Sequence, residues 1–97
     1  MSTTAIAAVT LRKRNTVRGE IVSVVSTQRP WARTDAELRD ASGTLVLRFI
    51  GRASVPGLAR GRRVVARGTP GLVGGAVVII NPLYSFTTGE CASGTNW

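Results

Sequence analysis

The chain has 97 residues, enough for one folded domain and too few for two. Apolar residues make up 43% of it, which is typical of a globular protein and excludes a fully disordered chain. Thirteen basic residues face only five acidic ones, and the net charge of +8 attracts polyanions. Twelve of the thirteen are arginine, whose planar guanidinium grips phosphate and stacks on bases, which favours nucleic acid as the partner. A GC-rich genome is the alternative explanation, but it does not account for the shortage of Asp and Glu.

The compartment is indicated by the cysteine content and by the N-terminal residues. Cys91 is the single cysteine, so an internal disulfide is impossible and a reducing compartment fits best. No run approaches the roughly 18 apolar residues that span a bilayer. The first residues carry an apolar piece before the basic triplet Arg12–Arg14, the reverse of a secretory signal. We therefore expect a cytoplasmic protein without a membrane partner.

The first third of the chain predicts an arm followed by one strand. Residues 1–15 are small and polar and end in the basic triplet, so we expect a flexible basic arm or an added first strand. Residues 17–25, "VRGEIVSVV", are rich in Val and Ile and predict a strand with a bulge or bend at Gly19. Pro30, within residues 26–35, excludes a central strand there.

A hairpin is predicted next, from residues 36–40 and 44–50. The first strand alternates Ala36 and Leu38 with charged residues, and the second has the faces Leu45, Leu47, Phe49 and Val46, Arg48, Ile50. Between them, "DASG" is a turn sequence in which Asp and Ser side chains can bond to nearby backbone.

Two more strands are expected in the rest of the chain, at residues 63–69 and 76–80. The connector "GRASVPGLARG" before the first of them is too rich in Gly and Pro for more than one helical turn. A loop follows that strand, and the apolar "AVVII" predicts a strand buried on both faces and ended by "NPLY". Residues 87–97 carry no core pattern, and we expect a flexible tail there.

Five short strands without a long helix predict an all-β barrel or sandwich. The break after the third strand falls where the five-stranded Greek-key OB-fold barrel has its bridging element, and barrel closure protects apolar strands from exposed edges. We expect an OB-fold domain over residues 16–86. Its expected core consists of Ile21, Leu38, Leu47, Val65, Val78 and Ile80.

Three segments resemble a known family. "ELRDASGTLVLRFIGR", "VPGLARG" and "INPLY" are, in order and spacing, similar to the OB domains of the tRNA-anticodon-binding and RecG-wedge type. The resemblance covers roughly residues 17–86 and looks closest to small stand-alone actinobacterial proteins of that kind. It implies a nucleic-acid-binding OB-fold, and no helicase motif accompanies it.

An OB-fold presents its ligand to the second and third strands and to the flanking loops. The first candidate site is the loop at residues 26–35, where Trp31 stands between Arg29 and Arg33. Such a ring can stack on bases while the guanidinium groups hold phosphates. Alternatively, Trp31 folds down as a lid on the end of the barrel.

Arginines of the strands and of the connector are the remaining candidates. Arg39 and Arg48 track a nucleic-acid backbone if they share one exposed face, or else Arg48 forms a cross-strand pair with Glu37. Around the connector stand Arg52, Arg60, Arg62 and Arg63, which we expect to project from one rigid corner. Gly51, Gly57 and Gly61 can expose backbone N–H groups to a phosphate, or else Pro56 and Gly57 serve only to turn the chain at that corner.

The residues that enzymes use are scarce. The chain has no His, the commonest general base, and its carboxylates are too scattered for a metal site. Cys91 lacks a His partner, and "GLVGG" lacks the Lys-Ser/Thr of a phosphate-binding loop. We therefore expect a non-enzymatic module without cofactor or metal that binds single-stranded or branched DNA, or RNA. The alternative is a protein-interaction module that docks on a larger complex.

Overall fold

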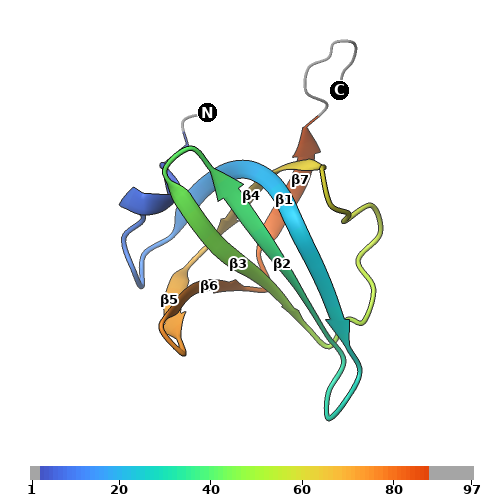
Figure 1. Cartoon of the computed structure of the whole chain (residues 1–97). Coiled ribbons are helices and arrows are strands. Elements are labelled where there is room, and N and C mark those ends of the chain that lie inside the picture. Colours follow the sequence, from blue (N-terminus) through green and yellow to red (C-terminus); the bar gives the residue numbers. More distant parts are fainter. Residues whose placement is uncertain (1–2, 88–97) are drawn as a thin grey trace.

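The structure, a computed structural model, describes residues 3–87 (Figure 1). This part of the chain holds one 3-10 turn, η1 (Ile6–Ala8), and seven strands. The strands are β1 (Asn15–Thr27), β2 (Arg33–Asp40), β3 (Gly43–Ile50), β4 (Arg63–Gly68), β5 (Pro70–Val73), β6 (Ala76–Ile80) and β7 (Leu83–Thr87). The prediction of an all-β protein is confirmed.

The strands form one strongly curved sheet in the order β5-β6-β3-β2-β1-β4-β7 (Figure 1). The long strand β1 pairs with β4 along its first half and with β2 along its second half, with an irregularity between Ile21 and Ser23. All pairs are antiparallel except β3 with β6. Because the order begins at β5 and ends at β7, strand pairing does not close the sheet into a barrel. The expected five-stranded Greek-key barrel is therefore not confirmed.

The five expected strands correspond to β1, β2, β3, β4 and β6, while β5 and β7 were not predicted. Strand β5 lies in the segment expected to be a loop. It forms a hairpin with β6 across Gly74 and Gly75, whose φ angles of 58° and 84° are those of a tight hairpin turn. Asn81 and Pro82 end β6 as expected, but the chain then continues into β7 beside β4.

The core lies on the inner face of the sheet. Ile21, Leu38 and Leu47 are fully buried there, as predicted. Val65 and Ile80 were assigned to the wrong face. Strand β4 instead points Val64 and Ala66 inward, and β6 points Ile79 inward and leaves Ile80 51% exposed. A shift of one residue exchanges the two faces of a strand, and these apolar runs carry no alternation that fixes the face.

Strand β6 is also not buried on both faces throughout. Ala76 and Ile80 at its two ends are exposed. Val78 is buried as predicted, but it does not belong to the main core cluster. Its side chain lies on the other face of the sheet from Ile79, beside its register partner Val46 of β3. The neighbouring strands therefore cover only the middle of β6.

The N-terminal segment is attached to the sheet. Ile6 is buried, the backbone N–H of Thr4 donates to the carbonyl oxygen of Thr16, and that of Ile6 donates to Asp40 Oδ2 at 2.9 Å. Residues 3–14 form no added strand. The boundary expected near residue 15 stays a prediction, and the tail expected at 87–97 lies, apart from Thr87, outside the described residues.

The turn between β2 and β3 has the predicted chemistry. Asp40 Oδ1 accepts hydrogen bonds from the backbone N–H of Ser42, from its hydroxyl group and from the backbone N–H of Gly43. Burial raises the pKa of the Asp40 carboxyl. The hydrogen bonds from Ser42, Ile6 and Gly43 outweigh this effect, so the pKa lies below its ordinary value. Asp40 thus joins the turn to the N-terminal segment.

Candidate nucleic-acid interface

The loop between β1 and β2 extends away from the sheet (Figure 1). Trp31 in this loop is 76% exposed. It therefore does not cover the end of the sheet, and the interpretation of Trp31 as a lid does not describe this structure. Its indole ring is available to a ligand.

The start of the connector, residues 51–62, is fixed beside this loop. Gly51 donates its backbone N–H to the carbonyl oxygen of Ala32 at 2.8 Å. The buried hydroxyl of Thr34 donates to the carbonyl oxygen of Arg52, also at 2.8 Å. These bonds bring Arg52 next to the loop. We call Arg29, Trp31, Arg33 and Arg52 the loop group.

The end of the connector lies elsewhere on β1. Gly61 donates its backbone N–H to the carbonyl oxygen of Ile21, and Ile21 donates to that of Arg62. Thr34, which holds Arg52, pairs with Ser26 of β1. Ser26 is five residues from Ile21, so the two ends of the connector meet β1 at points about 16 Å apart. The four connector arginines therefore do not project from one corner. Arg52 joins the loop group, whereas Arg62 and Arg63 lie beside the middle of β1.

Arg48 is engaged in an ion pair on the outer face of the sheet. Its Nε and Nη2 donate to the two carboxylate oxygens of Asp35 at 3.0 and 3.4 Å. Arg33 Nε lies 3.4 Å from the same carboxylate. The expected partner, Glu37, stands instead opposite Val46, with the hydroxyl of Ser23 3.5 Å away. A cross-strand pair is thus present with Asp35 in place of Glu37, and one carboxylate serves two guanidinium groups.

Apolar side chains flank this ion pair. Neighbouring residues in register on adjacent strands point to the same side of a sheet, so Val25, Asp35, Arg48 and Ile80 form one row across β1, β2, β3 and β6. Ile50 follows Arg48 on the same face. Val25, Ile50 and Ile80 are each about half exposed. We call these three residues the apolar face.

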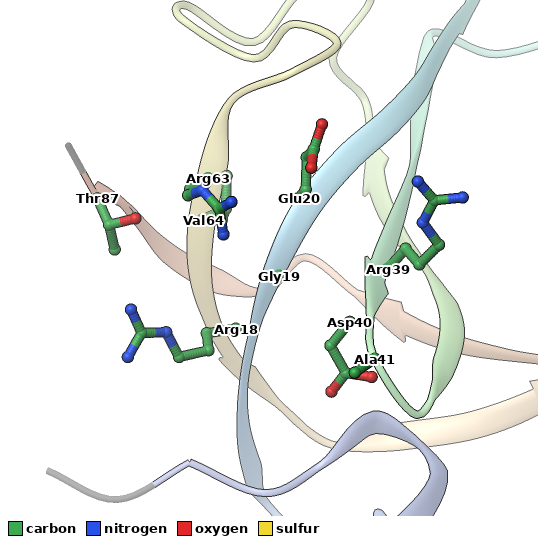
Figure 2. Close-up of a pocket in the computed structure, with 9 residues that line it drawn as sticks. All are labelled: Arg18, Gly19, Glu20, Arg39, Asp40, Ala41, Arg63, Val64 and Thr87. Carbon is green, nitrogen blue, oxygen red and sulfur yellow. The ribbon is translucent and has the colours of Figure 1, made fainter. Parts of the chain in front are cut away.

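Arg39 lies far from the loop group. It is six residues from Arg33 on β2, about 20 Å along the strand, with Glu37 between them on the same face. Its neighbours in register are Glu20 of β1 and, beyond Glu20, Arg63 of β4. Arg18, which is not among the predicted site residues, lines the same cleft as Arg39 and Arg63 (Figure 2). In the sequence, the alternation of Arg18 and Glu20 around Gly19 indicates only that Arg18 lies on the solvent-facing side of the strand.

All but one of the predicted arginines thus fall into two sets. Arg29, Arg33 and Arg52 belong to the loop group, and Arg48 is joined to it through the carboxylate that it shares with Arg33. Arg39, Arg62 and Arg63 lie beside the middle of β1. Arg60 is exposed in the connector, next to Gly61.

Within the part of the chain that the structure describes, most of the cations have no carboxylate beside them. Among residues 3–87, only Arg33 and Arg48 have a carboxylate oxygen within 4.0 Å. The same range contains no group of three or more His, Cys, Asp or Glu side chains that could hold a metal ion. No helix in the described part of the chain has the length and apolar character needed to cross a membrane.

No protein-family model, no curated protein and no solved structure matches the chain. The resemblance to anticodon-binding and RecG-wedge OB domains therefore stays a prediction.

Proposed function

We propose that this protein is a non-enzymatic module that binds single-stranded nucleic acid with little sequence preference. The observation that carries the proposal is the exposed ring of Trp31 between Arg29 and Arg33. Stacking of a base on an aromatic ring contributes about 1–3 kcal/mol and tolerates any sequence, because every base has a π-face. Arginines beside the ring can contact the phosphates on either side of the stacked base.

The apolar face supports a single strand as the ligand. Unpaired bases are flat and largely apolar, so they can lie on Val25, Ile50 and Ile80 while phosphates remain near Arg33. A duplex keeps its bases stacked inside and offers mainly phosphates to such a surface. The shared Asp35 reduces the local positive charge without removing it, which suits weak binding.

We also infer that the sheet is a variant of the OB-fold. Strands β1, β2 and β3 form a meander, β1 pairs with β4, and β3 runs parallel to β6. Only Asn81 and Pro82 separate β6, beside β3, from β7, beside β4. The two strands together take the place of the fifth strand of the OB-fold. In that arrangement, Trp31 occupies the loop that OB-folds commonly use for ligands.

The test is a titration with an oligo-dT strand, with Trp fluorescence as the signal. A Trp97→Phe background leaves Trp31 as the single tryptophan, so quenching reports stacking on that ring. The variants are compared by the fluorescence anisotropy of dye-labelled oligo-dT, because Trp31→Ala in this background has no tryptophan left to quench. Trp31→Ala should weaken binding by about 1–3 kcal/mol per stacked base, or roughly 5- to 150-fold, with the salt dependence unchanged. Arg29→Ala should reduce the logarithmic salt slope by about 0.7, because one phosphate contact is lost.

Arg14→Ala is the matched control. It removes the same charge, but Arg14 lies just before β1, at the opposite end of that strand from the loop. If Arg14→Ala and Arg29→Ala change affinity and slope equally, binding follows net charge and the loop is not the site. If Trp31→Ala binds like the parent protein, stacking on this ring is excluded.

A protein-docking module is the second candidate, favoured by apolar side chains at an edge of the sheet. Leu72 and Val73 of edge strand β5 are 61% and 43% exposed. Exposed apolar residues on an edge strand are suited to contact with another chain. Failure of the parent protein to bind single-stranded DNA or RNA at low salt would favour this function.

A further inference from the structure

A cleft of about 400 Å³ lies where β1 changes its pairing partner (Figure 2). At Glu20, β1 is paired with Arg39 of β2 on one side and with Arg63 of β4 on the other. From Gly19 back to Asn15, β1 pairs only with β4. Beyond Arg39, β2 no longer pairs with β1, and the cleft opens there.

Gly19 keeps the two sides of this cleft close together. A Cβ atom added at Gly19 would meet the backbone of Arg39, with the carbonyl carbon only 2.9 Å away. Any other residue would force β1 and the end of β2 apart. Glycine thus lets the two strands cross in direct contact, and this brings Arg39 near Arg18.

Three arginines from three strands surround the cleft. Arg18 of β1 and Arg63 of β4 lie on one side of Gly19, and Arg39 of β2 lies on the other (Figure 2). All three side chains are exposed. None has a carboxylate oxygen within 4.0 Å in the part of the chain that the structure describes.

Two carboxylates also line the cleft, but only one is free to oppose an anion. The oxygens of Asp40 accept hydrogen bonds from Ile6, Ser42 and Gly43, so this carboxylate serves the turn and the N-terminal segment. Among residues 3–87, Glu20 has no such partners, and it stands in the row between Arg39 and Arg63. The lining of the cleft therefore contains three guanidinium groups and one uncommitted carboxylate.

We propose that this cleft binds a phosphate group, held between Arg39 on one side and Arg18 and Arg63 on the other. Guanidinium groups donate paired hydrogen bonds to phosphate oxygens, and groups from three strands can surround the anion. The ligand is a free phosphate or pyrophosphate, or a phosphate of a nucleic-acid strand. The inference does not depend on the proposed function of the loop group, because about 20 Å of β2 separates Arg39 from Arg33.

The experiment measures pyrophosphate binding by calorimetry at constant ionic strength. The parent protein, Arg39→Ala, Arg63→Ala and the matched control Arg14→Ala are compared. Each variant removes one positive charge, and Arg14 lies before β1, outside both the cleft lining and the loop group. We expect the parent and Arg14→Ala to bind equally, and each cleft variant to bind roughly fivefold more weakly, as expected for a partly solvated ion pair.

Glu20→Gln provides a test in the opposite direction. It removes the carboxylate that competes with the anion, so pyrophosphate should bind more tightly than in the parent protein. Equal weakening by Arg14→Ala and Arg39→Ala would overturn the proposal, because binding would then follow net charge alone. Unchanged or weaker binding by Glu20→Gln would also contradict it.

Competition distinguishes the two sources of the phosphate. If oligo-dT displaces pyrophosphate from Trp31→Ala protein, the cleft accepts strand phosphates without help from the loop. If only inorganic phosphates compete, the cleft is a site for small anions. Either result supports a phosphate site, and both are independent of the fluorescence change that tests Trp31.

Discussion

Replacement of Gly57 by Ala tests the packing of the connector on the sheet. Gly57 has a φ of 80°, and an added Cβ would lie 2.9 Å from Cε2 and 3.1 Å from Cζ of Phe86. The Phe86 ring cannot move aside freely. It contacts Tyr84 edge-on at 5.6 Å between ring centroids and carries the Arg62 guanidinium 4.2 Å above its face.

Gly51 provides the matched control, because it has nearly the same φ of 83° but nothing within 4 Å of an added Cβ. Left-handed backbone costs a non-glycine residue about 1–2 kcal/mol, and overpacking adds about 1–3 kcal/mol. We expect Gly51→Ala to lower the free energy of unfolding by about 1 kcal/mol and Gly57→Ala by about 2–4 kcal/mol. Urea titration followed by circular dichroism measures both. Equal losses would refute the contact between the connector and Phe86.

Two further predictions concern the core and the N-terminal segment. Leu47→Ala should lower the free energy of unfolding by about 2–5 kcal/mol, because Leu47 is fully buried. Ile80 is half-exposed, so Ile80→Ala should change that free energy by about 0.5 kcal/mol or less. Similar losses for the two variants in a urea titration would show that the face of β6 is wrongly assigned. The pKa of Asp40 is lowered on folding, so its carboxylate stabilises the fold above the ordinary value of 3.8, and this contribution disappears as the pH falls through the lower, folded-state pKa. Melting temperatures of the parent protein and of Asp40→Asn are measured from pH 7 to pH 2. The difference between them should shrink in that acid range. A constant difference would contradict the lowered pKa of Asp40.

Local sequence patterns were sufficient for the β2–β3 hairpin but not for the outer strands. Alternation fixes the faces of β2 and β3, and the Asp40 turn is set by side-chain chemistry within four residues. In β4 and β6, consecutive apolar residues leave the face open, and pairing with β1 or β3 decides it. Strand β7 had a signal that was missed, because Tyr84 and Phe86 alternate with Ser85 and pack against the core.

The site shows the same division between local and long-range information. The grouping of Trp31 with Arg29 and Arg33 can be identified from five consecutive residues, whereas the exposure of the ring follows from the path of the loop. The cleft cannot, because Arg18, Arg39 and Arg63 meet only where β1 exchanges one partner strand for another. The sharing of Asp35 by two arginines likewise depends on the register of β2 with β3.

The central claim is that this basic protein recognises single-stranded nucleic acid through stacking and phosphate contacts. The most direct measurement is the salt dependence of the dissociation constant of the parent protein for oligo-dT and for a duplex of equal length. We predict tighter binding of the single strand and a logarithmic salt slope of about 2 or more, since each of three loop-group arginines contributes roughly 0.7. Absence of binding at low salt, or a duplex bound as tightly as the single strand, would contradict the claim.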